Sequence, residues 1–424
     1  MADVREKFRE LTRVFDPIYR PYQGADDGPG SSYVPEAHED YRKQLELALD
    51  LNENTKLLVA GQPGCGKTTL LQNVGQKLRR DGRIAAVVDL EALTSVQDLR
   101  SVEMHVAAIS TLLVEAKAAT APLATTTLDA CRRWLTKLQG GVEPGTDPEA
   151  IAAAFRRQLS AVQDSKALRD ELRDLVKRGE SEDPQYLLTR VLDDLASRRP
   201  VVILDGLDKV PPSQARDTFL DDKKKPMADV PGAAILTIPL SIVHEPEYNV
   251  LSERYNNADT AVLPAVRPWE LDSVTRKRTR FELGLAVLRR IIMARVEHLD
   301  PDLILPEAVE RAAVGSGGNI RQLARLMQAS VIKAAVRGGS FIEPQDIEAS
   351  IADQRESFHR GYKSYFMPVL KRVRDEHRLD EDAGDVTKLL LYGLWVTEYR
   401  NGFVWYDLPV PVEQLLEHRE RTRP

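Results

Sequence analysis

The sequence predicts an α/β fold in which helices cover both faces of a parallel sheet. Short apolar runs of the kind found in buried strands alternate with helical sequence, at 57–60, 83–93, 200–210, 232–242 and 260–266. Strands with apolar side chains on both faces are typical of a parallel sheet between two helix layers. A glycine-rich turn follows the first run, and an aspartate ends the apolar part of the third. Ligands of such sheets bind at the carboxyl ends of the strands, where both features fall.

The glycine-rich turn reads Gly61, Gln62, Pro63, Gly64, Cys65, Gly66, Lys67, Thr68, Thr69. A glycine, four residues and then Gly-Lys-Thr is the Walker A pattern of a phosphate-binding loop. We expect its glycines to take positive φ, so that the backbone approaches an anion closely. The N–H groups would converge on the phosphates, and a helix beginning near Lys67 would add its dipole. All nine residues are therefore candidate nucleotide contacts.

Three side chains of this turn have individual roles in the prediction. Lys67 would neutralise the β- and γ-phosphates of ATP, and the Thr68 hydroxyl would ligate Mg²⁺. Thr69 is a candidate for polar contacts at the start of the helix. The sequence thus predicts ATP and Mg²⁺ as cofactors.

The third apolar run supplies the second half of the site. Val201 to Leu204 lead into Asp205, which is the Walker B pattern. Asp205 would hold Mg²⁺ through water, opposite Thr68. Asp208, three residues further on, could orient or deprotonate the attacking water. The alternative for Asp208 is a helix N-cap or a surface charge.

The composition of the chain limits the class of protein to which it can belong. The chain has 424 residues, of which 42% are hydrophobic and 29% charged, as in a soluble protein of two or three domains. The net charge of −6 argues against a general nucleic-acid coat, although a local basic patch stays open. Two cysteines give neither a disulfide framework nor a zinc cluster. The charged amino terminus and the lack of an 18-residue apolar run predict a cytoplasmic protein without a membrane segment.

The chain divides into four predicted parts. They are an amino-terminal helix and linker at 1–34, the core at 35–268 with a helical insertion at about 96–199, a helical lid at 269–356 and a winged-helix-like module at 357–424. In the lid, Asn319 is a candidate N-cap and Gly338-Gly339 a helix stop. In the last part, Asn401-Gly402 between apolar runs predicts a hairpin. The insertion could carry a partner contact or be purely structural.

With these motifs in place, the chain resembles the AAA+ superfamily of P-loop ATPases. It is most similar to the origin-recognition and transposition-regulator branch, over roughly 35–424 outside the insertion. The segment GSGGNIRQL at 315–323 resembles the sensor 2 motif, which implies that Arg321 reaches the γ-phosphate. One position departs from the pattern: Gly206 stands where AAA+ proteins place a glutamate. The resulting D-G-L-D form resembles signalling ATPases known as STAND proteins and implies slow hydrolysis.

The resemblance implies further roles. The segment LSERYNN at 251–257 is similar to the place of an arginine finger, which would make Arg254 a contact to a neighbouring subunit; the alternative is a surface arginine. Thr237 is the candidate for sensor 1, with Ser241 as the alternative. The implied function is a slowly hydrolysing ATP switch that forms homo-oligomers and engages a protein partner.

Two alternative functions stay open at this point. One is a STAND-like signalling or defence scaffold. The other is a DNA-binding ATPase of replication or transposition, with the basic cluster Arg276-Lys277-Arg278 or the winged-helix-like module as the DNA contact. No membrane partner is expected. Trp395, Trp405 and Tyr406 are expected in the core of the terminal hairpin.

Overall fold

The structure consists of two units, each assembled from separate stretches of the chain. This computed structural model describes residues 2–17, 33–137, 145–179, 181–220, 230–254, 261–379 and 384–421. Unit 1 contains Met1–Glu39, Gly61–Thr69 and Leu263–Pro424. Unit 2 contains Asp40–Ala60 and Leu70–Val262. The Walker A loop thus groups with the carboxyl-terminal half of the chain, although the strand before it belongs to the sheet.

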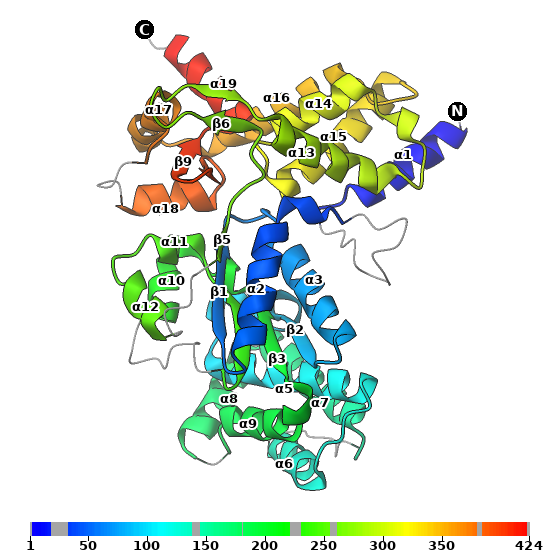
Figure 1. The fold of residues 1–424 in the computed structure, drawn as a ribbon, viewed down its shortest axis with the longest axis vertical. Coiled ribbons are helices and arrows are strands. Elements are labelled where there is room, and N and C mark those ends of the chain that lie inside the picture. Colours follow the sequence, from blue (N-terminus) through cyan, green and yellow to red (C-terminus); the bar gives the residue numbers. More distant parts are fainter. Residues whose placement is uncertain are drawn as a thin grey trace. The chain divides into compact units, whose positions relative to one another are not determined.

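The centre of unit 2 is a sheet with the strand order β2-β3-β4-β1-β5 (Figure 1). Its strands are β1 Lys56–Gly61, β2 Ala85–Asp89, β3 Val201–Asp205, β4 Ala233–Thr237 and β5 Ala261–Leu263. The pairs β1–β4, β3–β4 and β2–β3 are parallel, so β4 lies between the Walker A and Walker B strands. Every residue of β3 and β4 is buried, as expected for strands covered on both faces. The predicted parallel sheet is confirmed.

Helices precede and follow the strands of this sheet. Outside the insertion they are α2 Glu39–Leu51 before β1, and α3 Lys67–Arg80, α4 Leu90–Leu93, α10 Pro212–Phe219, α11 Leu240–Val243 and α12 Tyr248–Arg254 after the strands. The apolar face of α3, which repeats every three or four residues, is buried at Leu70, Leu71, Val74 and Leu78. Gly75 lets this helix approach β2, because a Cβ there would lie 2.5 Å from Val87 Cγ2.

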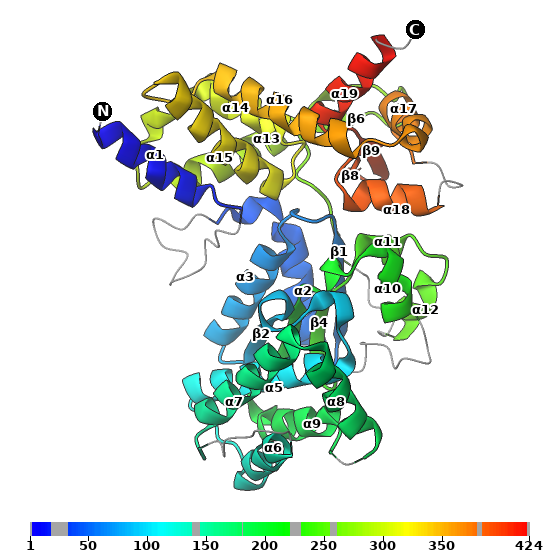
Figure 2. The same cartoon turned by 180° about the vertical axis from the view of Figure 1, so that it is seen from behind.

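The described part of the predicted insertion contains the α-helices α5 to α9, which lie together below the sheet in Figure 1 and are seen from behind in Figure 2. They are α5 Ser101–Ala118, α6 Thr125–Thr136, α7 Pro148–Asp164, α8 Lys166–Lys177 and α9 Pro184–Asp194. α5 packs against α7 and α9 and also against β2 and β3. Within this group the fully buried Glu103 pairs with Arg173 at 2.8 Å, because a buried carboxylate needs a partner. The insertion is therefore anchored on the sheet.

A helix bundle forms one part of unit 1. It consists of α1 Ala2–Val14, α13 Glu282–Val296, α14 Pro306–Gly315, α15 Ile320–Arg337 and α16 Pro344–Gly361. Phe8, Leu11 and Phe15 of the amino-terminal segment are buried in the core of this bundle. Burial of each side chain contributes roughly 1.5–3 kcal/mol to the stability of the fold. Arg295 Nη1 also donates to the Val14 carbonyl at 2.8 Å. The amino-terminal helix thus packs in the same core as the helices of the predicted lid.

The ends of α15 are those that the sequence predicts. The Asn319 side chain accepts a hydrogen bond from the Gln322 N–H, and Gly338 ends the helix with a φ of 76°. A left-handed residue after the last turn is a position that favours glycine.

The carboxyl-terminal part of unit 1 is a second group of elements. It contains α17 Met367–Glu376, α18 Gly384–Tyr392, β8 Thr397–Arg400, β9 Val404–Asp407 and α19 Val410–Arg421. β8 and β9 pair antiparallel across Asn401-Gly402, where Gly402 has a φ of 85°, which confirms the predicted hairpin. Trp405 is fully buried and Trp395 nearly so, as expected of core residues.

A second hairpin, which the sequence did not reveal, packs against this group. Its strands are β6 Trp269–Leu271 and β7 Arg278–Arg280. Leu271 shares a small core with Tyr399 and Trp405. Arg278 pairs with the buried Asp407 at 2.6 Å and lies over the Trp269 ring. The start of the predicted lid is therefore fastened to the carboxyl-terminal group.

Candidate phosphate-binding site

The Walker A loop has the backbone that its spacing predicts. Gly61, Gly64 and Gly66 have φ values of 149°, 85° and 111°, a region that L side chains rarely adopt. A Cβ on Gly64 would lie 2.5 Å from Arg321 Cβ, so this glycine also permits the close approach of α15. α3 begins at Lys67, as expected.

Residues of unit 1 hold the outer side of this loop by its carbonyl groups. Asn319 Nδ2 donates to the Pro63 carbonyl at 2.8 Å, and the Arg321 N–H donates to the Gly64 carbonyl at 3.1 Å. His38 Nε2 lies 2.6 Å from the Cys65 carbonyl. Because the C=O and N–H of one peptide point in opposite directions, these contacts turn the following N–H groups of Gly64 and Gly66 the other way. An inward row of N–H groups is what an anion requires.

His38 is a site residue that sequence analysis missed. Its side chain is buried, and burial, assisted by the charge of Lys67, lowers the pKa of His38 to about 4. The imidazole is therefore neutral at pH 7, and its Nε2–H donates to the Cys65 carbonyl. Only the fold brings it to the loop, since it precedes α2 and carries no motif of its own.

Lys67 is buried within the loop that it belongs to. Its Nζ donates to the carbonyls of Gly61 at 2.8 Å and Gln62 at 2.9 Å. The Gln62 side chain is only 2% exposed and binds the backbone of the carboxyl-terminal group. Thr68 and Thr69, both half-buried, occupy the first turn of α3.

The Walker B residues lie in unit 2, at the carboxyl ends of adjacent strands. Asp205 ends β3, is 4% exposed and is the register partner of Asp89 at the end of β2. Asp208 is buried in the turn Leu207–Lys209 that follows. Asp205 thus has the position that the motif predicts, and Asp208 is not a surface charge.

The backbone conformation at Gly206 explains why this position holds a glycine and not a glutamate. Its φ is 101°, and a Cβ there would lie 3.3 Å from the Glu91 N–H nitrogen. A glutamate at this position would therefore strain the backbone. The departure from the AAA+ pattern is built into the shape of the turn.

The remaining predicted residues occupy three different environments. Thr237 ends β4, and its buried hydroxyl donates to the Leu204 carbonyl at 3.3 Å. The Ser241 hydroxyl in α11 is buried, and it has no hydrogen-bond partner among the described residues. Arg254 is the last residue of α12, but its side chain lies outside the described part of the chain. Arg321 is a half-buried residue in the first turn of α15.

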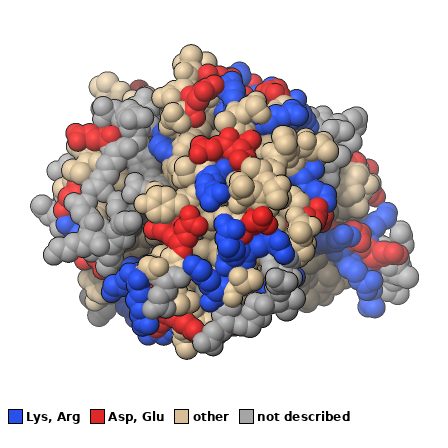
Figure 3. Space-filling model, turned by 90° about the horizontal axis from the view of Figure 1, so that it is seen from below, with Lys and Arg blue, Asp and Glu red and all other residues tan. Residues whose placement is uncertain are grey.

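The basic cluster Arg276-Lys277-Arg278, near the start of the predicted lid, uses its two arginines in contacts within unit 1. Arg276 donates to the carbonyls of Glu376 and His377, and Arg278 pairs with Asp407. Arg276 and Arg278 therefore serve internal contacts, whereas Lys277 is exposed. On the face seen from below in Figure 3, basic and acidic side chains are interspersed.

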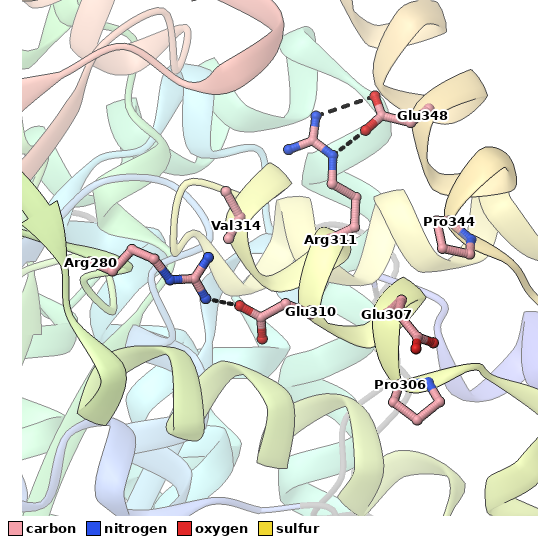
Figure 4. A pocket seen from close by; sticks show the side chains of 8 residues that line it. All are labelled: Arg280, Pro306, Glu307, Glu310, Arg311, Val314, Pro344 and Glu348. Carbon is pink, nitrogen blue, oxygen red and sulfur yellow. Dashed lines mark hydrogen bonds and ion pairs between the residues drawn. The ribbon is translucent and has the colours of Figure 1, made fainter.

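A surface pocket of about 560 Å³ lies elsewhere in unit 1. Figure 4 shows Arg280 directed to Glu310, and Arg311 directed to Glu348, across its wall. The other lining residues are Pro306, Glu307, Val314 and Pro344. No Walker A residue lines this pocket, and its four paired charges neutralise one another.

The sheet, the loop and the lid contacts define a P-loop NTPase domain. Residues 41–220 match the KAP family P-loop domain, which includes both Walker segments. Together with the five-stranded sheet, this match confirms the predicted fold class. No curated protein matches the chain in sequence. Among the described residues, no helix is long and apolar enough to cross a membrane.

Several solved structures align with nearly the whole length of the chain. Cdc6p from Pyrobaculum aerophilum is 13% identical, with 97% of this chain and 98% of that chain covered and a TM-score of 0.39. The ORC2 protein of Aeropyrum pernix, in ADPNP–ADP complexes, is 12% identical, with 96% of each chain covered and a TM-score of 0.43. The RuvB Holliday junction branch migration motor of Thermotoga maritima is 14% identical, with 91% and 95% covered and a TM-score of 0.37.

Proposed function

We propose that the protein is an AAA+ switch that binds ATP with Mg²⁺, hydrolyses it slowly and changes its assembly or its partner with nucleotide state. The observation that carries this proposal is the way the lid holds the phosphate loop. Asn319 and Arg321, at the start of α15, bind two successive loop carbonyls. A ligand that orders the loop therefore acts directly on the lid helix.

The proposed roles of the Walker residues follow their chemistry. Lys67 binds the β- and γ-phosphates, and the N–H groups of the loop bind their oxygens. Thr68 and Asp205 are the proposed Mg²⁺ ligands; a hydroxyl and a carboxylate fit this ion, which prefers oxygen. Bound Mg²⁺ would neutralise phosphate charge. Asp208 is the proposed base that positions the attacking water, and Thr237 the proposed sensor 1.

Two arginines are proposed to report the γ-phosphate. Arg321 would do so within one subunit, because its backbone already contacts the loop. Arg254 would do so from a neighbouring subunit, stabilising charge on the transferring phosphoryl group. A homo-oligomer is part of this proposal, because the arginine finger proposed here is supplied in trans by a neighbouring copy of the chain.

The second candidate function is a STAND-like scaffold in which binding matters more than turnover. The specific observation in its favour is Gly206, whose φ of 101° disfavours the usual catalytic glutamate. The two functions differ in turnover: the switch cycles through hydrolysis, whereas the scaffold stays assembled on bound ATP.

Binding of a fluorescent ATP analogue with Mg²⁺ tests the core of the proposal. Lys67→Ala should weaken binding by about a hundredfold or more, since it removes a buried charge from the phosphate loop. Lys77→Ala is the matched control, because Lys77 lies on the same helix with its side chain partly exposed and pairs with Asp81. Equal affinity of Lys67→Ala and wild type would refute the Walker A assignment.

Light scattering during size-exclusion chromatography tests the switch. ATP should increase the mass of the wild type, and Arg321→Ala should abolish this change while keeping nucleotide bound. Arg325→Ala, one turn further along α15, is the control. Adding duplex DNA at two salt concentrations forms the third arm, because binding to phosphate backbones falls steeply with salt. A mass change only with DNA would favour the DNA-binding alternative.

A further inference from the structure

Gln62, the second residue of the Walker A loop, binds the carboxyl-terminal group through both the nitrogen and the oxygen of its side-chain amide. Its Nε2 donates to the Leu391 carbonyl at 3.0 Å and to the Val396 carbonyl at 2.7 Å. Its Oε1 accepts from the Glu398 N–H at 2.9 Å. Both amide donors and the acceptor are therefore satisfied by one segment, 391–398, which joins α18 to β8. We call these three bonds the Gln62 clamp.

The chemistry of the clamp is specific to a neutral amide. Only Asn and Gln present two N–H donors beside a carbonyl acceptor, and Gln has the longer reach. The side chain is 2% exposed, so each backbone group that it satisfies would otherwise be buried without this partner. A Walker A pattern leaves this position open to any residue, so nucleotide binding alone does not require glutamine here.

Lys67 links the clamp to the phosphates. Its ammonium donates to the Gln62 carbonyl at 2.9 Å and to the Gly61 carbonyl at 2.8 Å. Phosphate oxygens compete for the same ammonium protons, and they are the stronger acceptors because they are charged. A phosphate bound by Lys67 therefore weakens the bonds that hold the Gln62 peptide, whose side chain is held by the clamp.

A second contact fastens β8 beside the same site. The Tyr399 hydroxyl donates to the Gly317 carbonyl at 2.6 Å, in the turn that leads to Asn319 and Arg321. Burial raises the pKa of Tyr399, so the hydroxyl stays a donor at all ordinary pH values. β8 thus contacts the Walker A loop and the turn before α15 with neighbouring residues.

We propose that Gln62 is a positioning residue through which occupancy of the phosphate loop loosens the α18–β8 segment, and that the clamp in turn opposes nucleotide binding. This inference rests on the proposed nucleotide-binding function. Coupling between two sites is reciprocal, so a segment that nucleotide loosens must also weaken nucleotide binding while it is fastened. Releasing the clamp should therefore tighten binding, whereas damage to an ordinary loop residue would weaken it.

The test measures affinity for ATPγS with Mg²⁺ and hydrogen exchange of 391–399 in the full-length protein. Gln62→Met keeps the length of the side chain, adds no charge and removes all three bonds. It should bind ATPγS about fivefold or more tightly, the low end of typical coupling. In the wild type, ATPγS should raise the exchange of 391–399 by at least about threefold, and in Gln62→Met it should not change it.

Two further variants keep the test decisive. Gln328→Met is the matched control, because Gln328 also joins distant segments, with Nε2 donating to the Thr12 carbonyl at 3.1 Å. It should leave both readouts as in the wild type. Tyr399→Phe removes the second contact of β8 and should tighten ATPγS binding by a smaller factor. This variant tests the inference if Gln62→Met does not fold.

The outcomes separate the two proposals. If the wild type does not bind ATPγS, the proposed function fails. If it binds but the exchange of 391–399 does not respond, or if neither Gln62→Met nor Tyr399→Phe binds more tightly, the clamp inference is overturned and nucleotide binding stands.

Discussion

The Walker A loop and the Walker B turn are shaped by different parts of the chain. The loop is held by Asn319, Arg321 and the segment 391–398, all more than two hundred residues away in the sequence. The Walker B turn is set by its own backbone, with Gly206 in a left-handed conformation and Asp208 in the short helix after it. The Walker A loop therefore depends on distant residues of unit 1, and the Walker B turn is a local feature of the sheet in unit 2.

The largest expected difference between the Walker A loop and the Walker B turn is in how stability depends on pH, because His38 contacts the loop. Its pKa is lowered from 6.5 to about 4, so the unfolded state binds a proton that the folded state resists. The contribution of His38 to stability is complete above pH 6.5 and is lost as the pH falls toward 4. Between about pH 7 and about pH 4.5 this amounts to about 2–3 kcal/mol.

Urea unfolding of wild type and His38→Gln at both pH values measures this difference. Glutamine can still donate to the Cys65 carbonyl but does not titrate, so the variant should lose about 2–3 kcal/mol less stability on acidification. The same pH dependence in both proteins would show that His38 is not a neutral support of the loop.

A smaller effect is expected when the Walker B turn is given its usual glutamate. Gly206→Glu should lower the free energy of unfolding by about 2 kcal/mol, because the residue needs a φ of 101°. It should not raise ATP turnover, because the carboxylate would enter a distorted turn. Gly206→Ala separates strain from charge. Faster turnover at unchanged stability would mean that the turn is not set by its backbone.

Asn319→Ala should cost about 1–2 kcal/mol of stability, because Asn319 caps α15 and also binds the Pro63 carbonyl. Nucleotide affinity should fall by about fivefold if one loop contact worth about 1 kcal/mol is lost. The control is Asp183→Ala, which removes the N-cap of α9 in the insertion. If both variants leave affinity unchanged, the lid does not shape the loop.

The smallest effect is expected at Thr237, at the carboxyl end of the central strand β4. Thr237→Val removes the hydroxyl that donates to Leu204 and should cost about 1 kcal/mol. If Thr237 is sensor 1, turnover should fall in Thr237→Val and recover in Thr237→Ser, with similar nucleotide affinity in both. Unchanged turnover in Thr237→Val would transfer the role to Ser241.

The features that the sequence predicted are those that short segments determine. Glycine spacing predicted the φ values of the loop, apolar runs predicted the strands, and Asn401-Gly402 predicted the hairpin of β8 and β9. Asn319 was predicted as an N-cap because that role involves a residue only three positions away. The roles proposed for Asp208, Arg254, Arg321 and Thr237 stay predictions.

What could not be predicted depends on contacts between distant segments. No sequence motif marks His38 or the partners of Gln62. In both cases a side chain binds backbone groups, which every residue provides whatever its type. The β6–β7 hairpin was missed because Arg278-Thr279-Arg280 lacks apolar alternation and resembles a basic cluster. The partners of its arginines are distant in the sequence or on another element: Arg278 pairs with Asp407, and Arg280 pairs with Glu310.

The packing of α1 has a consequence for synthesis of the chain on the ribosome. Its apolar face packs against α13 and α15, and α15 ends about 320 residues after α1. At usual elongation rates this separates the two by roughly 15–60 s. Throughout that time Phe8, Leu11 and Phe15 have no native partner, so the nascent amino terminus is a site where a chaperone would bind before the lid can form.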